Sequence, residues 1–195
     1  MIAAFTAASG VSVGVLASGG VDDAAVVDQV AERITTTSVI EVTPGGGLLF
    51  PIDPSPRCLV FNNFGGYSKA GRPNGHEGVD IGADEGQEVY AVEDGELTRI
   101  FEDLASAPGY GWSLVSDDDV QYRYYHLSGF APGLEVGDRV TRGDVIGYVG
   151  DTGNATPGGW HLHFEVRPGP QPRFGSASPV DPVPLFDIPV SCTVY

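Results

Sequence analysis

The chain has 195 residues, of which 42% are hydrophobic, so most of it is expected to fold. Its formal net charge is -16, a sign that repels phosphate backbones and anionic bilayers and argues against nucleic-acid binding. The high content of turn-forming residues, with 28 glycines and 15 prolines, predicts a turn-rich β protein.

The first 47 residues are predicted to lie outside the folded domain. Residues 1–20 carry no charge and resemble the apolar part of an export signal, although no basic residue precedes Arg33. The run is rich in Ala, Gly and Ser, which makes it a weak membrane span, and no other integral span is expected. Residues 21–47 combine helix-like spacing of Val and Ala with a Pro-Gly-Gly-Gly end, which predicts a short helix and a linker.

Residues 48–195 form the predicted domain, in which short strand-like runs alternate with glycine turns. Examples of the expected strands are residues 87–92, 96–100, 121–127, 145–149 and 161–167. An exposed hairpin turn is expected at Asp117–Asp119, and the proline-rich stretch from Pro168 should wrap the surface without regular structure. No alternation of strand and helix appears, so we predict an all-β fold, an antiparallel sandwich or partly open barrel, preceded by an irregular or helical segment.

The two cysteines, Cys58 and Cys192, lie near opposite ends of this domain. Neither belongs to a CxxC pair, so a cysteine-based zinc site is not supported. Paired as a disulfide, they would close a loop over most of the domain and would indicate an oxidising compartment. Two unrelated free thiols remain the alternative.

Each of the four histidines of the chain lies beside a strand-like segment or a glycine turn, and three of them fall into two tight clusters. In Gly75–Asp80, the imidazole of His76 and the carboxylate of Asp80 are four residues apart, with a glycine between them. Such a pair can converge on one ion if the chain turns and then enters a strand. Taken alone, however, this spacing is a weak signal.

The second cluster is Trp160–Glu165, which contains His161 and His163. Side chains alternate faces along a strand, so His161, His163 and Glu165 are expected on one face, above an apolar floor. An exposed polar strand face would give the same pattern. Together, the two clusters supply the nitrogen and oxygen ligands that zinc prefers, and the metal site becomes the leading interpretation.

The chain resembles zinc peptidases of the lysostaphin (LytM-like) type over residues 48–186. The motifs that carry this resemblance are HEGVDIGA at 76–83, YYHL at 124–127, the double-glycine region at 137–153 and WHLHFE at 160–165, with VFNNFG at 60–65 and VDP at 180–182. Their combination is highly specific. The resemblance implies an all-β domain of the duplicated hybrid motif type and a zinc endopeptidase that cuts peptide cross-links of bacterial peptidoglycan.

The resemblance also implies a role for each matching residue. His76, Asp80 and His163 would bind one zinc ion per chain, and water or a substrate carbonyl would fill the open position. His161 and His126 would face the metal without binding it, accept a proton from the water and stabilise the tetrahedral intermediate. Glu77 is not part of an HExxH helix, since position 80 is Asp.

Four further residues are weaker candidates for supporting roles. Glu165 could orient one histidine through a ring N–H, or could be an ordinary surface charge. Tyr124 shares a face with His126 in a regular strand, and Trp160 and Tyr110 could line a substrate groove. For each of these aromatic residues, packing is the alternative.

Three other functions compete with this interpretation. Biotinyl and lipoyl carrier domains share the glycine spacing, but the single lysine, Lys69, lies outside the hairpins and the histidines would have no role. A zinc D-Ala-D-Ala-type carboxypeptidase would use a similar metal set. A non-catalytic wall-binding or activator homologue should have lost a ligand, and none is missing. We therefore expect an extracytoplasmic enzyme that acts on peptidoglycan stem peptides or cross-bridges.

Overall fold

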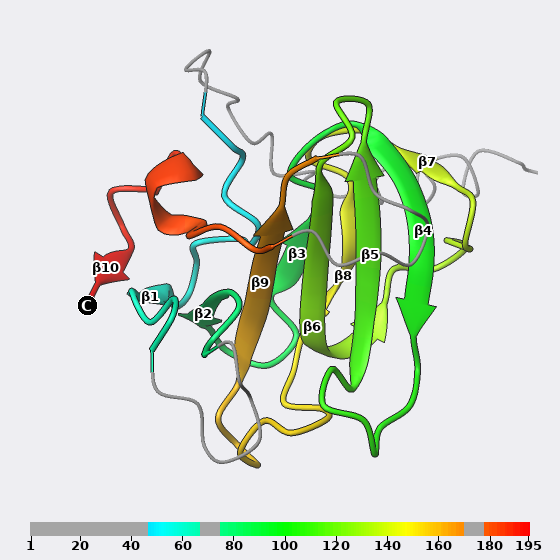
Figure 1. The fold of residues 1–195 in the computed structure, drawn as a ribbon. Coiled ribbons are helices and arrows are strands. Elements are labelled where there is room, and N and C mark those ends of the chain that lie inside the picture. The colour runs from blue at the N-terminus through cyan, green and yellow to red at the C-terminus, as the bar shows by residue number, and fades with distance from the viewer. Residues whose placement is uncertain (1–46, 67–74, 170–177) are drawn as a thin grey trace, which may run out of the picture. The chain divides into compact units, whose positions relative to one another are not determined.

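The computed structural model describes residues 47–66, 75–169 and 178–195 (Figure 1). The predicted export signal and nearly all of the predicted helix and linker therefore lie outside the described residues. The strands are β1 (Leu59–Phe61), β2 (Val79–Gly82), β3 (Glu88–Tyr90), β4 (Gly95–Phe101), β5 (Tyr110–Ser116), β6 (Gln121–Phe130), β7 (Arg139–Val140), β8 (Val145–Val149), β9 (His161–Arg167) and β10 (Thr193–Val194). Within this part of the chain, no helix is both long enough and apolar enough to cross a membrane.

All ten strands belong to one open sheet, in the order β10-β1-β2-β9-β6-β5-β4-β7, with β8 pairing both β3 and β6. Every pair of strands is antiparallel except β10 with β1, which run parallel. The all-β, largely antiparallel prediction is confirmed. The central strands β2, β9 and β6 lie side by side in Figure 1, and they carry the histidine motifs.

The strand predictions differ in accuracy along the chain. Residues 145–149 and 161–167 form β8 and β9 with the expected bounds, and the acidic turn at 117–119 is exposed between β5 and β6. Strand β5 was not among the strands named from the sequence, although Tyr110, Trp112 and Leu114 alternate with Gly111 and Ser113. The C-terminal stretch contains more structure than expected, with a 3₁₀ turn at Val183–Leu185 and strand β10.

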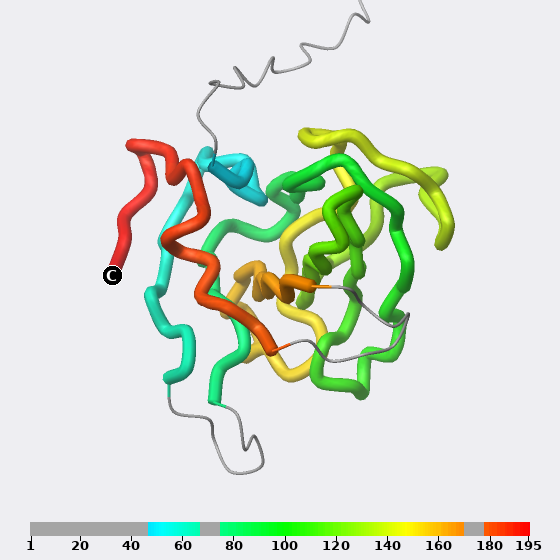
Figure 2. The backbone as a smooth tube through the Cα atoms, turned by 45° about the horizontal axis from the view of Figure 1, so that its top comes forward, coloured from blue at the N-terminus to red at the C-terminus, as the bar shows by residue number. Residues whose placement is uncertain are grey.

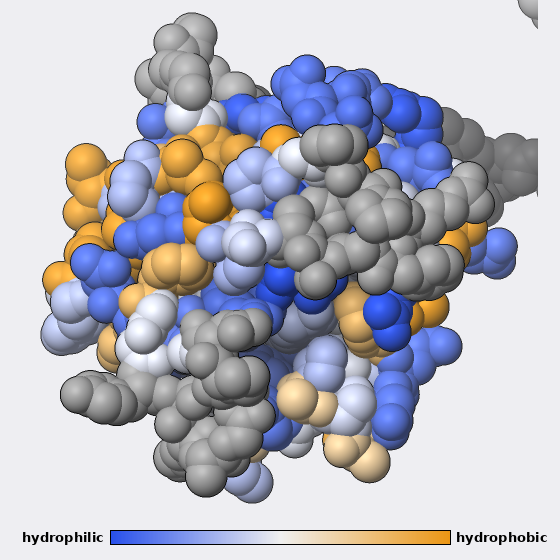
Figure 3. All heavy atoms as spheres, in the orientation of Figure 1, coloured by the Kyte–Doolittle hydropathy of each residue, from blue (hydrophilic) through white to orange (hydrophobic). Residues whose placement is uncertain are grey.

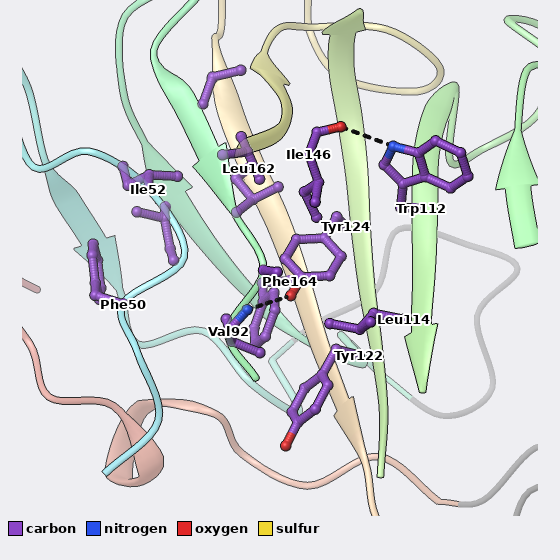
Figure 4. Close-up of a cluster of buried hydrophobic side chains, with 14 of the residues drawn as sticks. Phe50, Ile52, Val92, Trp112, Leu114, Tyr122, Tyr124, Ile146, Leu162 and Phe164 are labelled. Atoms are coloured by element: carbon purple, nitrogen blue, oxygen red, sulfur yellow. Dashed lines mark hydrogen bonds between the residues drawn. The ribbon is translucent and has the colours of Figure 1, made fainter. Parts of the chain in front are cut away.

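The hydrophobic core lies on one face of β9 and β6 (Figure 4). Phe164 of β9 and Tyr124 of β6 pack with ring centroids 5.1 Å apart, and Trp112 of β5 is completely buried nearby. The polar atoms of these rings are satisfied, since Trp112 Nε1 donates to Ile146 O at 2.9 Å and Val92 N donates to Tyr124 Oη at 3.1 Å. Because Phe164 faces the core, its neighbours in β9 present their side chains to the opposite face.

A disulfide between Cys58 and Cys192 joins the two ends of the domain, with Cα atoms 4.7 Å apart, which confirms the predicted pairing. Beside it, β10 pairs with β1, and the two segments run together in Figure 2. The same side of the molecule displays a gathering of apolar atoms in Figure 3, whereas much of the remaining described surface in that view is hydrophilic. The C-terminal segment is thus fixed to β1, which pairs with β2 next to the histidines.

Candidate metal centre

The strand register brings the two sequence clusters together on one face of the sheet. Asp80 of β2 lies directly opposite His163 of β9, and Gly82 lies opposite His161. Directly paired residues of antiparallel strands hold their Cβ atoms close together, on the same face. His76 lies three residues before the start of β2, and its ring reaches the same place. Two motifs that are far apart in the sequence therefore form one site.

Three side chains converge at this site. Oδ1 of Asp80 lies 3.0 Å from Nδ1 of His163 and 3.2 Å from Nε2 of His76. One ligand-competent atom from each of the three residues lies within 4.8 Å of the others, a group that could hold a metal ion. Two imidazole nitrogens and one carboxylate oxygen form a donor set that suits zinc and leaves a coordination position open.

The hydrogen bonds indicate which ring atom of His163 is available for a cation. Its Nε2 lies 3.3 Å from Oε1 of Glu165. A carboxylate can only accept, so Nε2 carries a proton and donates it. Nδ1 is then the atom of His163 that can bind a metal in place of its contact with Asp80.

The charges at the centre favour a cation. Burial raises the pKa of Asp80, but hydrogen bonds with His163 and His76 outweigh burial and hold that pKa well below its usual range. Burial likewise raises the pKa of Glu165, yet its bonds to His163 and Arg167 lower it overall. For His163, the bonds to both carboxylates outweigh burial and raise the pKa. Both carboxylates are therefore ionised at neutral pH.

Behind His163, Glu165 belongs to a buried network of charges. Arg167 Nε donates to Glu165 Oε2 at 2.7 Å, and Arg123 Nη1 lies 3.4 Å from the same oxygen. Arg167 also donates to Glu77, the residue after His76. The ion pairs compensate the buried charge of Glu165 and fix the carboxylate that holds His163. Glu165 is thus buried and bonded to a candidate ligand.

His126 reaches the site through an irregularity in β6. In a regular strand it would share the core face with Tyr124, as the sequence predicts, but its ring lies 4.8 Å from the ring of His161, on the opposite face. His126 has a positive φ of 65°, and the ladders on both sides of it shift register near Tyr110 and Leu127. A bulge of this kind re-aims a side chain. The predicted alternation is therefore wrong at His126.

A loop segment around Thr152 holds His126 in place. Nδ1 of His126 lies 2.8 Å from the carbonyl oxygen of Thr152, which can only accept, so this nitrogen carries the proton. The hydroxyl of Thr152 accepts from Tyr110 N at 3.0 Å and donates to Leu127 O at 2.7 Å. Beside this loop, the backbone of Gly109 lies against that of Gly153, since a Cβ added to Gly109 would lie 2.4 Å from Gly153 N. The contact requires glycine there.

The ring of His161 is oriented in the same way. Its Nδ1 lies 2.6 Å from the carbonyl oxygen of Gly159, and its Nε2 lies 3.8 Å from Oδ1 of Asp80. Nε2 of the ring therefore points to the centre. Burial, together with the neighbouring His161 and His163, lowers the pKa of His126 to about 4, so that ring is neutral at neutral pH.

The remaining predicted residues have different surroundings. Tyr124 is completely buried and its hydroxyl accepts from Val92 N, so it packs in the core and does not share the face of His126. Trp160 and Tyr110 are half-buried and pack against the core. A role for either of them in binding substrate stays a prediction.

Sequence reasoning missed several residues that surround the site. Tyr125 stacks on His163 with ring centroids 5.7 Å apart and an interplanar angle of 6°. The side chain of Asn63 bonds to Asp80, and that of Thr152 fixes the loop beside His126. The signal for Tyr125 and Asn63 was present, because both lie inside the motifs YYHL and VFNNFG.

Comparison with known proteins places these motifs in a family. The model of peptidase family M23 matches residues 74–182, more than half of the chain. The glycyl-glycine endopeptidase ALE-1 of Staphylococcus capitis is 34% identical over 128 residues, which are 63% of this chain and 32% of that protein. The DD-carboxypeptidase/endopeptidase Mpg of Neisseria meningitidis is 37% identical over 97 residues, 50% of this chain and 21% of that protein. The chain thus spans about a third or less of the length of these curated relatives.

Solved structures agree with the sequence comparison. The catalytic domain of the antimicrobial peptidase lysostaphin from Staphylococcus simulans superposes with a TM-score of 0.55 at 28% identity, covering 64% of this chain and 89% of that domain. The region matched by the family model contains all four histidines and Asp80. The chain belongs to peptidase family M23.

Proposed function

We propose that this protein is a zinc-dependent endopeptidase that hydrolyses peptide cross-links of bacterial peptidoglycan. One observation carries the proposal. Three candidate ligands, His76, Asp80 and His163, converge within 4.8 Å of one another, and the rings of His161 and His126 lie on the same face beside them. A structural metal site would have four protein ligands, whereas this arrangement leaves room for a reacting group.

The proposed metal ligands are Nε2 of His76, Oδ1 of Asp80 and Nδ1 of His163, with one zinc ion per chain. Zinc bound there would supply Lewis acidity that activates water and polarises the peptide carbonyl. Proton transfer and stabilisation of the developing charge would be carried out by side chains of the protein. The mixed nitrogen and oxygen donors favour zinc over calcium or magnesium, which take oxygen ligands.

His161 and His126 are the proposed catalytic residues, and their tautomers suit the transfer of protons. Each ring has its Nδ1 proton directed at a backbone carbonyl, of Gly159 and Thr152 respectively. In the neutral ring, Nε2 then has a lone pair that can accept a proton from water, and the ring can later donate that proton to the leaving amine. When protonated, either ring can also stabilise negative charge on the carbonyl oxygen.

Glu165 is the proposed positioning residue for His163. It accepts the Nε2 proton of His163 and is itself held by Arg167 and Arg123. A carboxylate in this position fixes the ring orientation and strengthens the ring as a ligand. The burial of Glu165, which is 4% exposed, favours this role over that of a surface charge.

The relatives support the proposed substrate and location. The relatives include a glycyl-glycine endopeptidase and an antimicrobial peptidase, and their peptidase activity supports peptidoglycan as the substrate of this chain. The disulfide supports an extracytoplasmic location, since such bonds persist in oxidising compartments. An export signal in residues 1–20 is part of the same proposal.

A carboxypeptidase that trims D-Ala ends is the second candidate, and one observation favours it. The relative Mpg carries both activities in its name, DD-carboxypeptidase and endopeptidase. The same five residues would serve either reaction, because the two differ in the peptide bond that is presented. A non-catalytic homologue is less well supported, since His161 and His126 are retained and correctly turned.

The proposal is tested by metal content and by fragment release from purified peptidoglycan. The wild type should contain about one zinc ion per chain and should release peptide fragments. The variant His163→Ala should lose both properties. His161→Ala serves as the matched comparison, since it should retain zinc and lose cleavage.

The fragments identify the reaction, because mass spectrometry separates a cut cross-link from a lost terminal D-Ala. Release of D-Ala alone would establish the carboxypeptidase. Zinc binding without cleavage of any wall type would favour the non-catalytic homologue. A wild type that binds no zinc would refute the proposed metal centre.

A further inference from the structure

The side chain of Asn63 pairs with Asp80 through two hydrogen bonds. Nδ2 of Asn63 donates to Oδ2 of Asp80 at 2.9 Å, and the backbone N–H of Asp80 donates to Oδ1 of Asn63 at 3.3 Å. A backbone amide can only donate, so this second bond fixes which end of the Asn63 amide carries the oxygen. The nitrogen end of the amide therefore faces Asp80, and Nδ2 is the donor in the first bond.

This pairing gives the two oxygens of Asp80 different roles. Oδ2 is occupied by Asn63, whereas Oδ1 faces His163, His76 and, at a longer distance, His161. A carboxylate free to rotate could offer a cation either oxygen or both. A carboxylate fixed at Oδ2 offers Oδ1 alone, already aimed at the two histidines.

The turn that carries Asn63 also holds His76. Its residues, Asn63–Gly66, close on themselves through Gly66 N and Asn63 O at 3.0 Å. Gly65 N donates to His76 O at 2.8 Å, and His76 N donates to Gly66 O at 3.2 Å. Nδ1 of His76 is buried and has no hydrogen-bond partner within the described residues, so the backbone pairing with the turn is what holds His76 in addition to its contacts at the centre. The Asn63–Gly66 turn thus positions two of the three candidate ligands.

The C-terminal segment contacts β1 just before the Asn63–Gly66 turn and supports it. Strand β1 ends at Phe61, and Asn62 N donates to the carbonyl oxygen of Tyr195 at 3.1 Å. Phe61 stacks on the ring of Tyr195 with centroids 5.6 Å apart. The disulfide at Cys58 fixes the start of the same strand. Asn63 is therefore held in place by contacts that are independent of the histidines.

We infer that Asn63 is a positioning residue for the metal centre, which presents Asp80 to the cation through Oδ1 only. The inference rests on the proposed zinc site. Loss of the amide would free Oδ2 and release the carboxylate to rotate. Outer partners of metal ligands contribute about 10- to 100-fold in metal affinity, and the same range is expected here.

The test uses Asn63→Leu, which keeps the branched shape of asparagine and removes both hydrogen bonds. Asn62→Leu is the matched control, because Asn62 is exposed and its bond to Tyr195 O is made by the backbone N–H, which the substitution keeps. Zinc affinity is measured on the full chain by competition with a chelator, and Co²⁺ absorption spectra report the coordination. Circular dichroism and thermal unfolding of the metal-free proteins verify the fold, with Asn63→Ala as a substitute if Asn63→Leu fails to fold.

The expected result is a fall in zinc affinity of about tenfold or more for Asn63→Leu, with Asn62→Leu unchanged. The Co²⁺ spectrum should change as well, because a freed Oδ2 alters the coordination, and a merely structural role would leave it as it is. Equal zinc affinities and equal spectra for the two leucine variants would overturn the inference. A wild type without zinc affinity would instead overturn the proposed function, so the two failures are distinguishable.

Discussion

Thr152 allows a sharp test of how the loop beside His126 supports the site. Its hydroxyl bridges Tyr110 N and Leu127 O at 3.0 and 2.7 Å, and its carbonyl accepts from His126. The substitution Thr152→Val keeps the shape of the side chain and removes the hydroxyl. Thr152→Ser keeps the hydroxyl and removes one methyl group.

The magnitudes follow from the groups left without partners. In Thr152→Val, the amide of Tyr110 and the carbonyl of Leu127 both lose a hydrogen bond, which should lower the free energy of unfolding by about 2–3 kcal/mol. In Thr152→Ser, the lost methyl group costs at most about 0.8 kcal/mol. The difference between the two variants should therefore exceed about 1 kcal/mol.

The assays are urea unfolding, read by circular dichroism, and the rate of fragment release from peptidoglycan. Misplacing a catalytic group by about 1 Å can cost about 100-fold, and we expect a loss of that order in kcat/KM for Thr152→Val. Thr152→Ser should stay within about threefold of the wild type, because its hydrogen bonds are kept. Equal stability of the two variants would refute the reasoning, since it would mean that the hydroxyl bridge contributes nothing.

Two further predictions concern stability. Replacing both Cys58 and Cys192 by serine should lower the free energy of unfolding by up to about 5 kcal/mol in denaturant titrations, because the bond closes a loop with a separation of 134 residues. A loss below about 1 kcal/mol would contradict this account. Burial lowers the pKa of His126 from 6.5 to about 4, so the unfolded chain takes up a proton in that window before the folded one does. Stability should therefore fall between pH 6.5 and pH 4 by up to about 3 kcal/mol through this group, and His126→Asn, which tolerates the positive φ and does not titrate, should show a smaller fall. The measurement is urea unfolding of both proteins at pH 6.5 and at pH 4. An equal fall in stability for the wild type and for His126→Asn would contradict the assigned burial effect.

The regular parts of the site could be predicted from the sequence. The alternation in β9 placed His161, His163 and Glu165 on one face, and the structure has them there because β9 is a regular strand with Phe164 in the core. The spacing of His76 and Asp80 suggested convergence. Which strand would lie beside β9 did not follow from the spacing, because register depends on pairing between distant segments.

The irregular parts were not predictable from periodicity. A strand pattern assumes that every residue has extended dihedrals, and the φ of 65° at His126 breaks that assumption. As a result, Tyr124 was assigned to the face of His126 although it lies in the core. Tyr125, which stacks on His163, was missed for the same reason. A histidine with positive φ marks strain that the surrounding contacts must compensate, here through Thr152 and the glycine contact beside it.

The two kinds of support suggest that metal binding and proton transfer are separable in this protein. Asp80 and His163 are direct partners in the ladder of β2 and β9, and Asn63 and Glu165 hold them from behind. His126, by contrast, stands on a bulge and depends on a loop carbonyl. Strand ladders open far less readily than loops, so perturbing the loop should leave the zinc affinity intact. Thr152→Val should accordingly lose cleavage with its zinc retained, whereas Asn63→Leu should lose zinc affinity first. A parallel loss of zinc in both variants would show that the loop and the ladder act as one unit.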